Sequence, residues 1–328
     1  MSSSIYGLLF FLGVIIDMGR KSLENQMKYI LYAKMNDGIG HSKHEDKQKL
    51  IDDGKYNFKD GLESIYSYGT ADKYMQVVRE YSQYLYDKGV SKYSLLDKTQ
   101  GYAEQYLKER LDKGYSLYTI KAERSALGKI YGKTIEIELP TRKTQNINRS
   151  RLEVENDKHF SKERNSDLIT IATATGTRRS DLKKMRVTDF FYVTTDKRKQ
   201  YMFVHIDKSK GGRNRIALVE PTKQKEVEKI LADRIANHQE KICTKVHSAM
   251  DVHSYRRSYA KEIYTQLSRD KEFREDILQC YPARNENVKS DTYISRKTQE
   301  HFDRDSVYII SQCLGHNRLS VSVNHYLI

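Results

Sequence analysis

The chain has 328 residues, which is enough for two domains that each bury a core of their own. It carries 58 Lys and Arg against 44 Asp and Glu, a formal net charge of +14. Such an excess favours a polyanionic partner, because a basic surface releases counterions when it binds phosphates, but charge alone does not establish one. The three cysteines are scattered and have no CxxC spacing, which excludes a disulfide framework and a CxxC zinc site.

The N-terminal segment is unusually apolar. Residues 5–16 (IYGLLFFLGVII) make a run of 12, whereas a helix that spans a bilayer needs about 20. The run also lacks the basic start and the small-residue cleavage site of a secretory signal. Two interpretations remain: a helix that packs in a core or an interface, or sequence ahead of a natural start at Met18. We favour the second, in which residues 1–17 lie outside the natural protein.

The following segment is polar and charged up to residue 69. Apolar residues occur at helical spacing only in patches, such as Met27, Ile30 and Leu31. We therefore interpret residues 1–69 as an N-terminal extension. It is either a small helical arm or a partly ordered segment.

A clear helical pattern begins at residue 70. Apolar residues recur at spacings of three and four up to Gly89, and the pattern repeats before Gly114 and again up to Ile130. There is no strand pattern in this region. Residues 70–139 are thus predicted to form a compact all-helical domain with Lys and Arg on its polar faces.

A linker is predicted between this domain and the next. Residues 140–151 (PTRKTQNINRSR) are polar, with four basic residues and no acidic one. We place the basic linker at residues 140–154. It is either solvated or lies against a phosphate backbone.

The second domain, residues 155–328, mixes two patterns. Residues 168–185 read as helices on either side of a turn at Gly176. Three β-branched and aromatic runs then predict an antiparallel meander, and the remainder is helical except for a polar stretch near residues 282–291. The predicted fold class is mainly α with a small antiparallel β-sheet (α+β). The predicted strands are residues 190–193, 201–206 and 215–219.

Three segments of this domain carry side chains suited to phosphate chemistry. In TGTRRSDL (175–182), Arg178 lies at a helix start and Asp181 follows one turn later, so the carboxylate can hold a neighbouring group in place. In HSYR, His253 and Arg256 are three residues apart, and in LGH the histidine is His316. Taken singly, each segment has a simpler structural explanation. The first would be an ordinary capped helix, the second a solvated pair of side chains and the third a histidine in the core.

Together, the segments resemble the tyrosine recombinase and integrase family. Its catalytic domain carries TGxRxSEL, HxxRR, LGH and a C-terminal tyrosine in this order. The resemblance covers residues 155–328 and, more loosely, residues 70–135, which would be the core-binding domain of that family. The matching segments here are TGTRRSDL (175–182), HSYRR (253–257), LGHNR (314–318) and NHYL (324–327).

The resemblance implies a role for each matched residue. Tyr326 would be the nucleophile, and Arg178 and Arg256 would clamp the scissile phosphate. His253 would hydrogen-bond this phosphate and assist proton transfer. His316 would be a donor that supports the phosphate and the nucleophile.

The family also places a lysine, the general acid for the leaving oxygen, in the turn between the second and third strands. SKGGRNRIAL (209–218) matches this turn, and Lys210 fits best, with Lys208 as the alternative. A solvated hairpin tip is the simpler explanation of the same lysines. Asp181 would act indirectly, by holding its neighbours.

The implied activity is site-specific DNA recombination. DNA strands would be cut and rejoined through a covalent 3′-phosphotyrosyl intermediate, with no metal and no cofactor. An inactive DNA-binding architectural or regulatory relative is the alternative, and a helical nucleic-acid-binding protein with coincidental motifs is a weaker one. The N-terminal extension, which could bind additional arm-type sites, favours an integrase of a mobile element over a chromosome-dimer resolvase.

The implied partner is double-stranded DNA with specific recombination sites, on which a synaptic tetramer would assemble. Accessory DNA-bending or directionality proteins are further expected partners, and a membrane is not. The expected location is the cytoplasm, in association with the nucleoid when DNA is bound.

The sequence departs from the family in its spacing. His316 follows Arg256 by 60 residues, which indicates an insertion within residues 282–303. Tyr326 lies one residue further from His316 than is usual. Only Leu327 and Ile328 follow Tyr326. We therefore expect no C-terminal docking helix, and a monomer in free solution whose assembly is driven mainly by neighbouring DNA sites.

Overall fold

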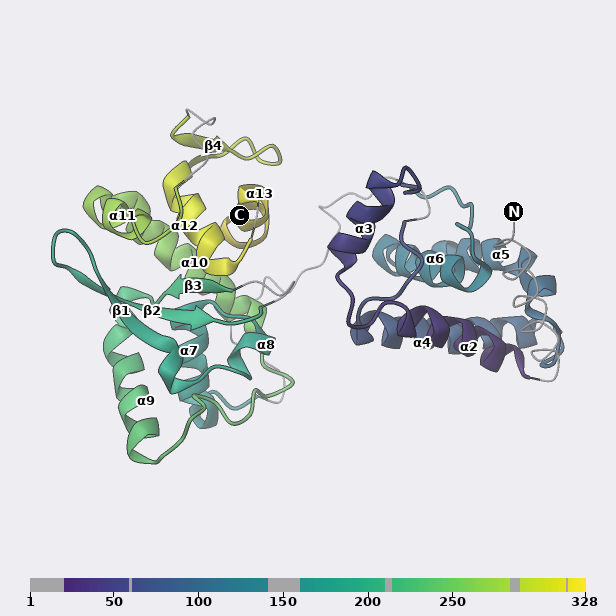
Figure 1. Ribbon diagram of the computed structural model, residues 1–328, viewed down its shortest axis with the longest axis horizontal. Helices are drawn as coiled ribbons and strands as arrows, with labels where there is room; N and C mark the ends of the chain where they lie inside the picture. Colours follow the sequence, from purple (N-terminus) through teal and green to yellow (C-terminus); the bar gives the residue numbers. More distant parts are fainter. Residues whose placement is uncertain (1–20, 59–60, 141–159, 210–213, 284–289, 317) are drawn as a thin grey trace. The chain divides into compact units, whose positions relative to one another are not determined.

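The computed structural model describes residues 21–58, 61–140, 160–209, 214–283, 290–316 and 318–328 (Figure 1). The chain divides into two compact units, residues 1–147 and 148–328, each with a hydrophobic core of its own. The apolar run at residues 5–16, most of the linker and Lys210 lie outside the described residues.

The described part of the first unit is all-helical. Four of its helices begin directly after a serine whose hydroxyl accepts a backbone N–H from the first turn, which satisfies a donor that has no partner within the helix. The last helix ends at Gly132, whose φ of 68° suits glycine. The helices are α2 (Leu23–Asn36), α3 (Lys43–Asp52), α4 (Tyr68–Asp87), α5 (Gly101–Asp112) and α6 (Leu117–Tyr131), with a 3₁₀ turn at Leu96–Thr99.

The core of this unit reaches further towards the N-terminus than residue 70. Helices α4, α5 and α6 contribute fully buried residues such as Val78, Leu107 and Leu127. Helix α2 contributes Leu23 and Met27 to the same core. In contrast, α3 buries no residue. Residues before position 70 are therefore part of the packed unit, through α2.

The second unit is mainly helical, with a small antiparallel sheet, and this confirms the predicted fold class. Strands β1 (Phe190–Thr194), β2 (Gln200–Ile206) and β3 (Arg215–Leu218) pair in chain order, with Phe190 opposite Val204 and Phe203 opposite Leu218. The helices are α7 (Ser166–Thr175), α8 (Arg179–Leu182), α9 (Gln224–Ala236), α10 (Val252–Arg269), α11 (Lys271–Leu278), α12 (Arg304–Leu314) and α13 (Leu319–Ser322), followed by a π-helical turn at Val323–Leu327.

Helix α10 lies at the centre of this unit. Its residues Tyr255, Tyr259 and Ile263 are buried, and it packs against α7, against α12 and against the final turn (Figure 1). Helix α12 in turn contacts β3. As a result, the start of α10 lies where the end of α7, the end of α12 and the last residues meet.

A small β-hairpin lies within residues 282–303, where the sequence indicates an insertion. Its strands are β4 (Thr292–Ile294) and β5 (His301–Asp303), which pair antiparallel. The Tyr264 hydroxyl accepts a hydrogen bond of 3.1 Å from the backbone N–H of Asp303, which anchors the hairpin to α10.

Among the helices that the structure describes, none is long and apolar enough to cross a membrane.

Candidate active site

Arg256, in the second turn of α10, is the most buried charged side chain of the site. It is 1% exposed. One guanidinium N–H group donates to the carbonyl of Gly176 and another to the carbonyl of Leu314. Its Nε donates to the hydroxyl of Tyr326 at 3.2 Å. The buried cation is thus tied to the ends of α7 and α12 and to the last turn of the chain.

Gly176 has to be glycine at this position. Its φ is 57°, and a Cβ there would lie 2.2 Å from Cδ1 of Tyr259. The left-handed backbone ends α7 and turns the Gly176 carbonyl towards Arg256. The glycine of the TG pair in this motif therefore has a structural cause.

Arg178 approaches the same carbonyls from another element. It is the N-cap residue of α8, and its Nη2 donates to the carbonyl of Leu314 at 3.1 Å. The Leu314 carbonyl thus accepts from both Arg178 and Arg256. Leu314 is the last residue of α12, so this carbonyl has no partner within the helix and lies at the negative end of its dipole. The end of α12 holds the two guanidinium groups side by side.

His316 and Tyr326 lie next to Arg256. Their ring centroids are 5.3 Å apart, and the Arg256 guanidinium carbon is also 5.3 Å from the Tyr326 ring centroid. Nε2 of His316 is 3.4 Å from Nη2 of Arg256, and its Nδ1 is 3.0 Å from the Ser322 hydroxyl. Because a guanidinium can only donate, we assign the proton to Nδ1, with Nε2 as the acceptor.

Burial and mutual repulsion shift the pKa values of this cluster. Burial, followed by the charge of Arg256, lowers the pKa of His316 to about 3, so the imidazole is neutral at physiological pH. Burial also lowers the pKa of Arg256 to about 10, which leaves it protonated. The site thus combines two charged guanidinium groups, a neutral imidazole and a phenol.

Asp181 connects Arg178 to a third arginine, Arg215. Its carboxylate is 5% exposed, and Oδ2 accepts from Nη2 of Arg215 at 3.0 Å and from the backbone N–H of Arg178 at 3.3 Å. The Ser209 hydroxyl donates to the same carboxylate and accepts from Nη1 of Arg178 at 2.9 Å. Sequence reasoning missed Ser209 and Arg215. The signal that could have found them is that both lie in SKGGRNRIAL (209–218), the segment singled out for its lysine.

The remaining predicted residues lie around this cluster. His253, in the first turn of α10, is exposed and shares no hydrogen bond with the other predicted site residues in the described structure. Desolvation of its ring, followed by the charge of Arg256, nevertheless lowers its pKa, which indicates proximity to the cluster. The backbone N–H of Lys208 donates to Oδ1 of Asn214 at 3.0 Å, which is a contact between the segment that follows β2 and the residue that precedes β3. Lys210 itself is outside the described residues.

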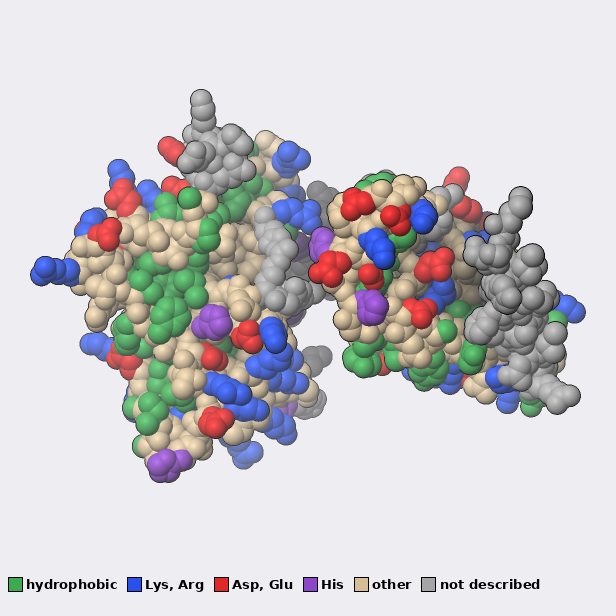
Figure 2. Space-filling view, in the orientation of Figure 1, with side chains coloured by type: hydrophobic (Ala, Val, Ile, Leu, Met, Phe, Trp, Pro, Cys, Tyr) green, Lys and Arg blue, Asp and Glu red, His purple; other side chains and the backbone are tan. Residues whose placement is uncertain are grey.

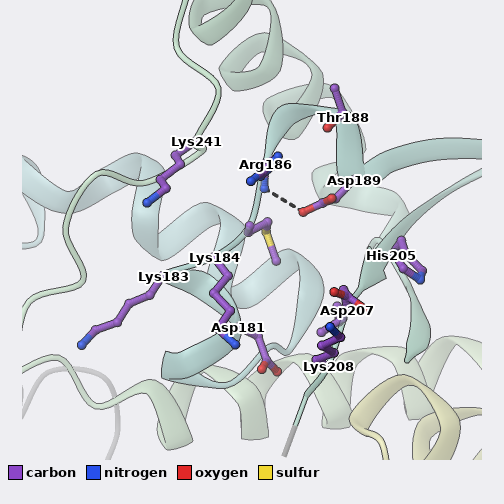
Figure 3. A pocket seen from close by; sticks show the side chains of 12 residues that line it. Asp181, Lys183, Lys184, Arg186, Thr188, Asp189, His205, Asp207, Lys208 and Lys241 are labelled. Atoms are coloured by element: carbon purple, nitrogen blue, oxygen red, sulfur yellow. Dashed lines mark hydrogen bonds between the residues drawn. The ribbon is translucent and has the colours of Figure 1, made fainter. Parts of the chain in front are cut away.

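A basic cavity of about 530 Å³ lies beside Asp181 (Figure 3). In Figure 3, the side chains of Lys184 and Lys208 are drawn on either side of the Asp181 carboxylate. Figure 2 shows Lys and Arg side chains gathered on the second unit near α8. The basic residues that line the cavity are Lys183, Lys184, Arg186, Lys208 and Lys241.

No metal cluster is found in the described ranges, where no group of three or more His, Cys, Asp and Glu side chains could hold an ion. The direct contacts bring together residues from four separate segments of the chain, namely Arg178, Asp181, Arg256, His316 and Tyr326.

Comparisons with known proteins give structural similarities only. No family model matches the chain, and neither does any curated protein. Among solved structures, the chain is similar to the XerH site-specific recombinase bound to its difH substrate in a pre-cleavage complex, with 15% identity over 95% of this chain and 91% of that chain and a TM-score of 0.47.

Two further similarities are of the same kind. The XerA recombinase is 14% identical over 80% of this chain and 88% of that chain, with a TM-score of 0.30. The Tn1549 transposon integrase in complex with transposon right end DNA is 11% identical over 85% and 92%, with a TM-score of 0.37. At these identities and scores, the similarity carries no conclusion about the chemistry of this chain.

Proposed function

We propose that this chain is a tyrosine-type site-specific DNA recombinase, which cleaves and rejoins DNA strands through a 3′-phosphotyrosyl intermediate. The contact that carries the proposal is the 3.2 Å hydrogen bond between the Tyr326 hydroxyl and Nε of Arg256. This contact supports the proposal because the phenol that the reaction requires as its nucleophile lies against a buried cation. Arg178 donates to the Leu314 carbonyl, which also accepts from Arg256.

In the proposed reaction, Arg178 and Arg256 bind the non-bridging oxygens of the scissile phosphate. Arginine suits this task because its planar fork donates two hydrogen bonds and does not lose its charge. Since Arg256 is 1% exposed and Tyr326 occupies its Nε, a phosphate must displace the Tyr326 hydroxyl to reach this nitrogen. Substrate binding would then release the tyrosine from its resting contact.

The Tyr326 oxygen then attacks phosphorus, and the bond to the 5′ oxygen breaks. His253 would assist the transfer of the tyrosine proton, and Lys210, or Lys208 as the alternative, would protonate the departing 5′ oxygen. In the second half of the reaction, the 5′-hydroxyl of a partner strand attacks the phosphotyrosine and frees Tyr326. The ester conserves the energy of the phosphodiester, so no nucleotide cofactor is required.

His316 has a role that depends on its tautomer. With the proton on Nδ1, Nε2 accepts from Arg256 and orients it. A donor to phosphate needs the proton on Nε2 instead. The Ser322 hydroxyl permits this change, because it can either accept from Nδ1 or donate to it. We propose that phosphate binding favours the second tautomer.

The wider assignments follow from the same proposal. The helical unit, with residues 70–139 at its centre, would bind DNA as the core-binding domain, and the basic linker 140–154 would follow the phosphate backbone. We propose an integrase of a mobile element that acts in the cytoplasm on nucleoid DNA and assembles as a tetramer on its sites.

Mapping of covalent protein–DNA junctions tests the proposal. The protein is incubated with nicked duplexes taken from the DNA that flanks its gene, and adducts are isolated after denaturation. We expect an adduct at a defined phosphate, with the 3′ end attached to protein and a free 5′-hydroxyl. Specific binding without any adduct would instead support the inactive DNA-binding alternative.

A further inference from the structure

Three arginines from three elements converge on the C-terminal end of α12. Arg178 and Arg256 share the carbonyl of Leu314, as described above. The third, Arg215, is the first residue of β3, and its Nη1 donates to the preceding carbonyl, that of Cys313. Its side chain is 7% exposed, so Arg215 is inside the protein rather than on a surface that DNA could touch.

The side chain of Arg215 packs directly on the turn that precedes His316. Gly315 has a φ of 64°, and a Cβ at this position would lie 2.7 Å from Cδ and 2.9 Å from Nε of Arg215. The glycine is needed for its backbone conformation and also to leave room for the arginine. The position of Arg215 therefore limits where the Gly315–His316 turn can lie.

The other side of Arg215 reaches Arg178 through Asp181. Nη2 of Arg215 binds Oδ2 of Asp181 at 3.0 Å, and the same oxygen accepts the backbone N–H of Arg178. Ser209 closes a second connection from this carboxylate to the Arg178 guanidinium. One guanidinium thus joins the segment that carries Arg178 to the segment that carries His316.

We propose that Arg215 is a positioning residue, which fixes the Arg178 guanidinium and the His316 turn relative to each other for phosphate binding. The inference rests on the proposed function. Arg215 also neutralises Asp181, which leaves the charges of Arg178 and Arg256 available for a phosphate. A lysine could not replace it, because a single ammonium group cannot reach Asp181 and the Cys313 carbonyl with the same divergent geometry.

Two substitutions of Arg215 separate the effect of its hydrogen bonds from the effect of its charge. Arg215→Met keeps a similar length and loses both hydrogen bonds, whereas Arg215→Lys keeps the charge. We expect the rate constant of single-turnover cleavage on a nicked duplex to fall about 100-fold in Arg215→Met, because a shift of about 1 Å in the groups that bind the reacting atoms has an effect of this size. In Arg215→Lys, the same rate constant should fall at least about tenfold. The dissociation constant for the same DNA should change less than about threefold, since Arg215 is buried.

Arg274→Met is a matched control in the same unit. Arg274 also bridges a helix carbonyl and an aspartate, since its Nη1 donates to Leu267 at 2.9 Å and its Nε lies 3.7 Å from Asp303. It has no contact with the predicted site residues in the described structure. We expect its cleavage rate constant to equal that of the wild type. If Arg274→Met is as slow as Arg215→Met, the effect is general loosening and the positioning role is wrong.

The cleavage experiment has to separate the rate constant of the reaction from its amplitude, which reports the fraction of protein that reacts. A substitution that only unfolds part of the sample lowers the fraction of protein that reacts, while the remaining molecules react at the wild-type rate. A positioning defect lowers the rate constant itself. A wild-type rate constant in Arg215→Met, or full rescue by Arg215→Lys, would overturn the inference.

Hydrogen–deuterium exchange tests the same inference without DNA. We expect faster exchange at residues 178–182 and 313–316 in Arg215→Met, and no change there in Arg274→Met. Unchanged exchange would overturn the inference, whatever the enzyme does. If exchange changes as expected but the wild type forms no adduct with any DNA, the proposed function fails while Arg215 keeps its positioning role.

Discussion

The Tyr326 hydroxyl accepts a hydrogen bond from Nε of Arg256, although 70 positions separate the two residues in the chain. The guanidinium also lies over the tyrosine ring, with 5.3 Å between its carbon and the ring centroid. The final turn is therefore held against α10 by the cation that we expect to bind the substrate. In the proposed function, this contact would hold the Tyr326 hydroxyl beside the phosphate-binding arginine until DNA binds.

Arg178→Ala should remove transition-state stabilisation while it leaves most of the DNA affinity in place. One lost donor to a developing oxyanion costs roughly 3–4 kcal/mol, so we expect cleavage to slow at least about 100-fold. The measurement is single-turnover cleavage of a nicked duplex, with binding followed separately. Arg269→Ala, an exposed position at the end of α10, is the control. A loss of less than about tenfold would show that Arg178 does not clamp the phosphate.

Gly176→Ala should destabilise the second unit for two reasons. The new Cβ would clash with Tyr259, and alanine disfavours the left-handed backbone conformation of this residue. Gly176 has a φ of 57°, and the new Cβ would lie 2.2 Å from Tyr259. Gly132 has a φ of 68° and nothing within 4 Å of its Cβ position, so Gly132→Ala measures the conformational cost alone, about 1–2 kcal/mol. We expect urea unfolding of Gly176→Ala to show a further loss of about 1–3 kcal/mol. If Gly176→Ala and Gly132→Ala lose the same free energy of unfolding, Tyr259 can move away from the new Cβ without cost.

His316 should make the second unit less stable in acid. Its pKa is about 3 when folded and near 6.5 when unfolded, so the unfolded chain takes up the proton first as the pH falls. Its contribution to stability is complete above pH 6.5 and is lost progressively towards pH 3, with a slope of at most about 1.4 kcal/mol per pH unit. Because the ring is only half-buried, the measured slope should be smaller.

Urea unfolding of His316→Gln at several pH values between 4 and 8 tests this expectation. We expect a shallower decline of stability in acid than in the wild type. His301→Gln, an exposed substitution on β5, should leave the slope unchanged. If His316→Gln has the wild-type slope, His316 is not held neutral by Arg256 and its surroundings.

Cleavage should survive excess EDTA, because the proposed chemistry uses arginines rather than a metal to stabilise the phosphate. Binding should still weaken steeply with salt, with a log–log slope of about −0.9 for each phosphate that the protein neutralises on duplex DNA. Adduct yield and DNA affinity are measured across a salt series, with and without EDTA. Strict dependence on Mg²⁺ would contradict the mechanism.

The sheet of the second unit could be predicted from local patterns. The expected strands at residues 190–193, 201–206 and 215–219 match β1, β2 and β3 within a residue or so, because alternation and turn chemistry are properties of neighbouring residues. Strands β4 and β5 were not predicted. Each has three residues, too few for an alternating pattern to be recognised.

The site shows where sequence reasoning ends. Arg178, Arg256 and Tyr326 could be singled out only because four motifs occur in a familiar order, and their catalytic roles stay predictions. Arg215 has no such signal, since its partners Asp181 and Cys313 are 34 and 98 positions away. Long-range contacts of this kind depend on how α12 packs on β3, which no spacing in the sequence reveals.

Identification of the residue that is attached to DNA tests the central claim most directly. Wild-type protein is trapped on a nicked duplex that prevents religation, the adduct is digested, and the nucleotide-bearing peptide is sequenced by mass spectrometry. We predict that the nucleotide is attached to Tyr326 through its 3′-phosphate, and that Tyr326→Phe binds the same DNA with nearly wild-type affinity but forms no adduct. An adduct on another residue, or one that persists in Tyr326→Phe, would contradict the account.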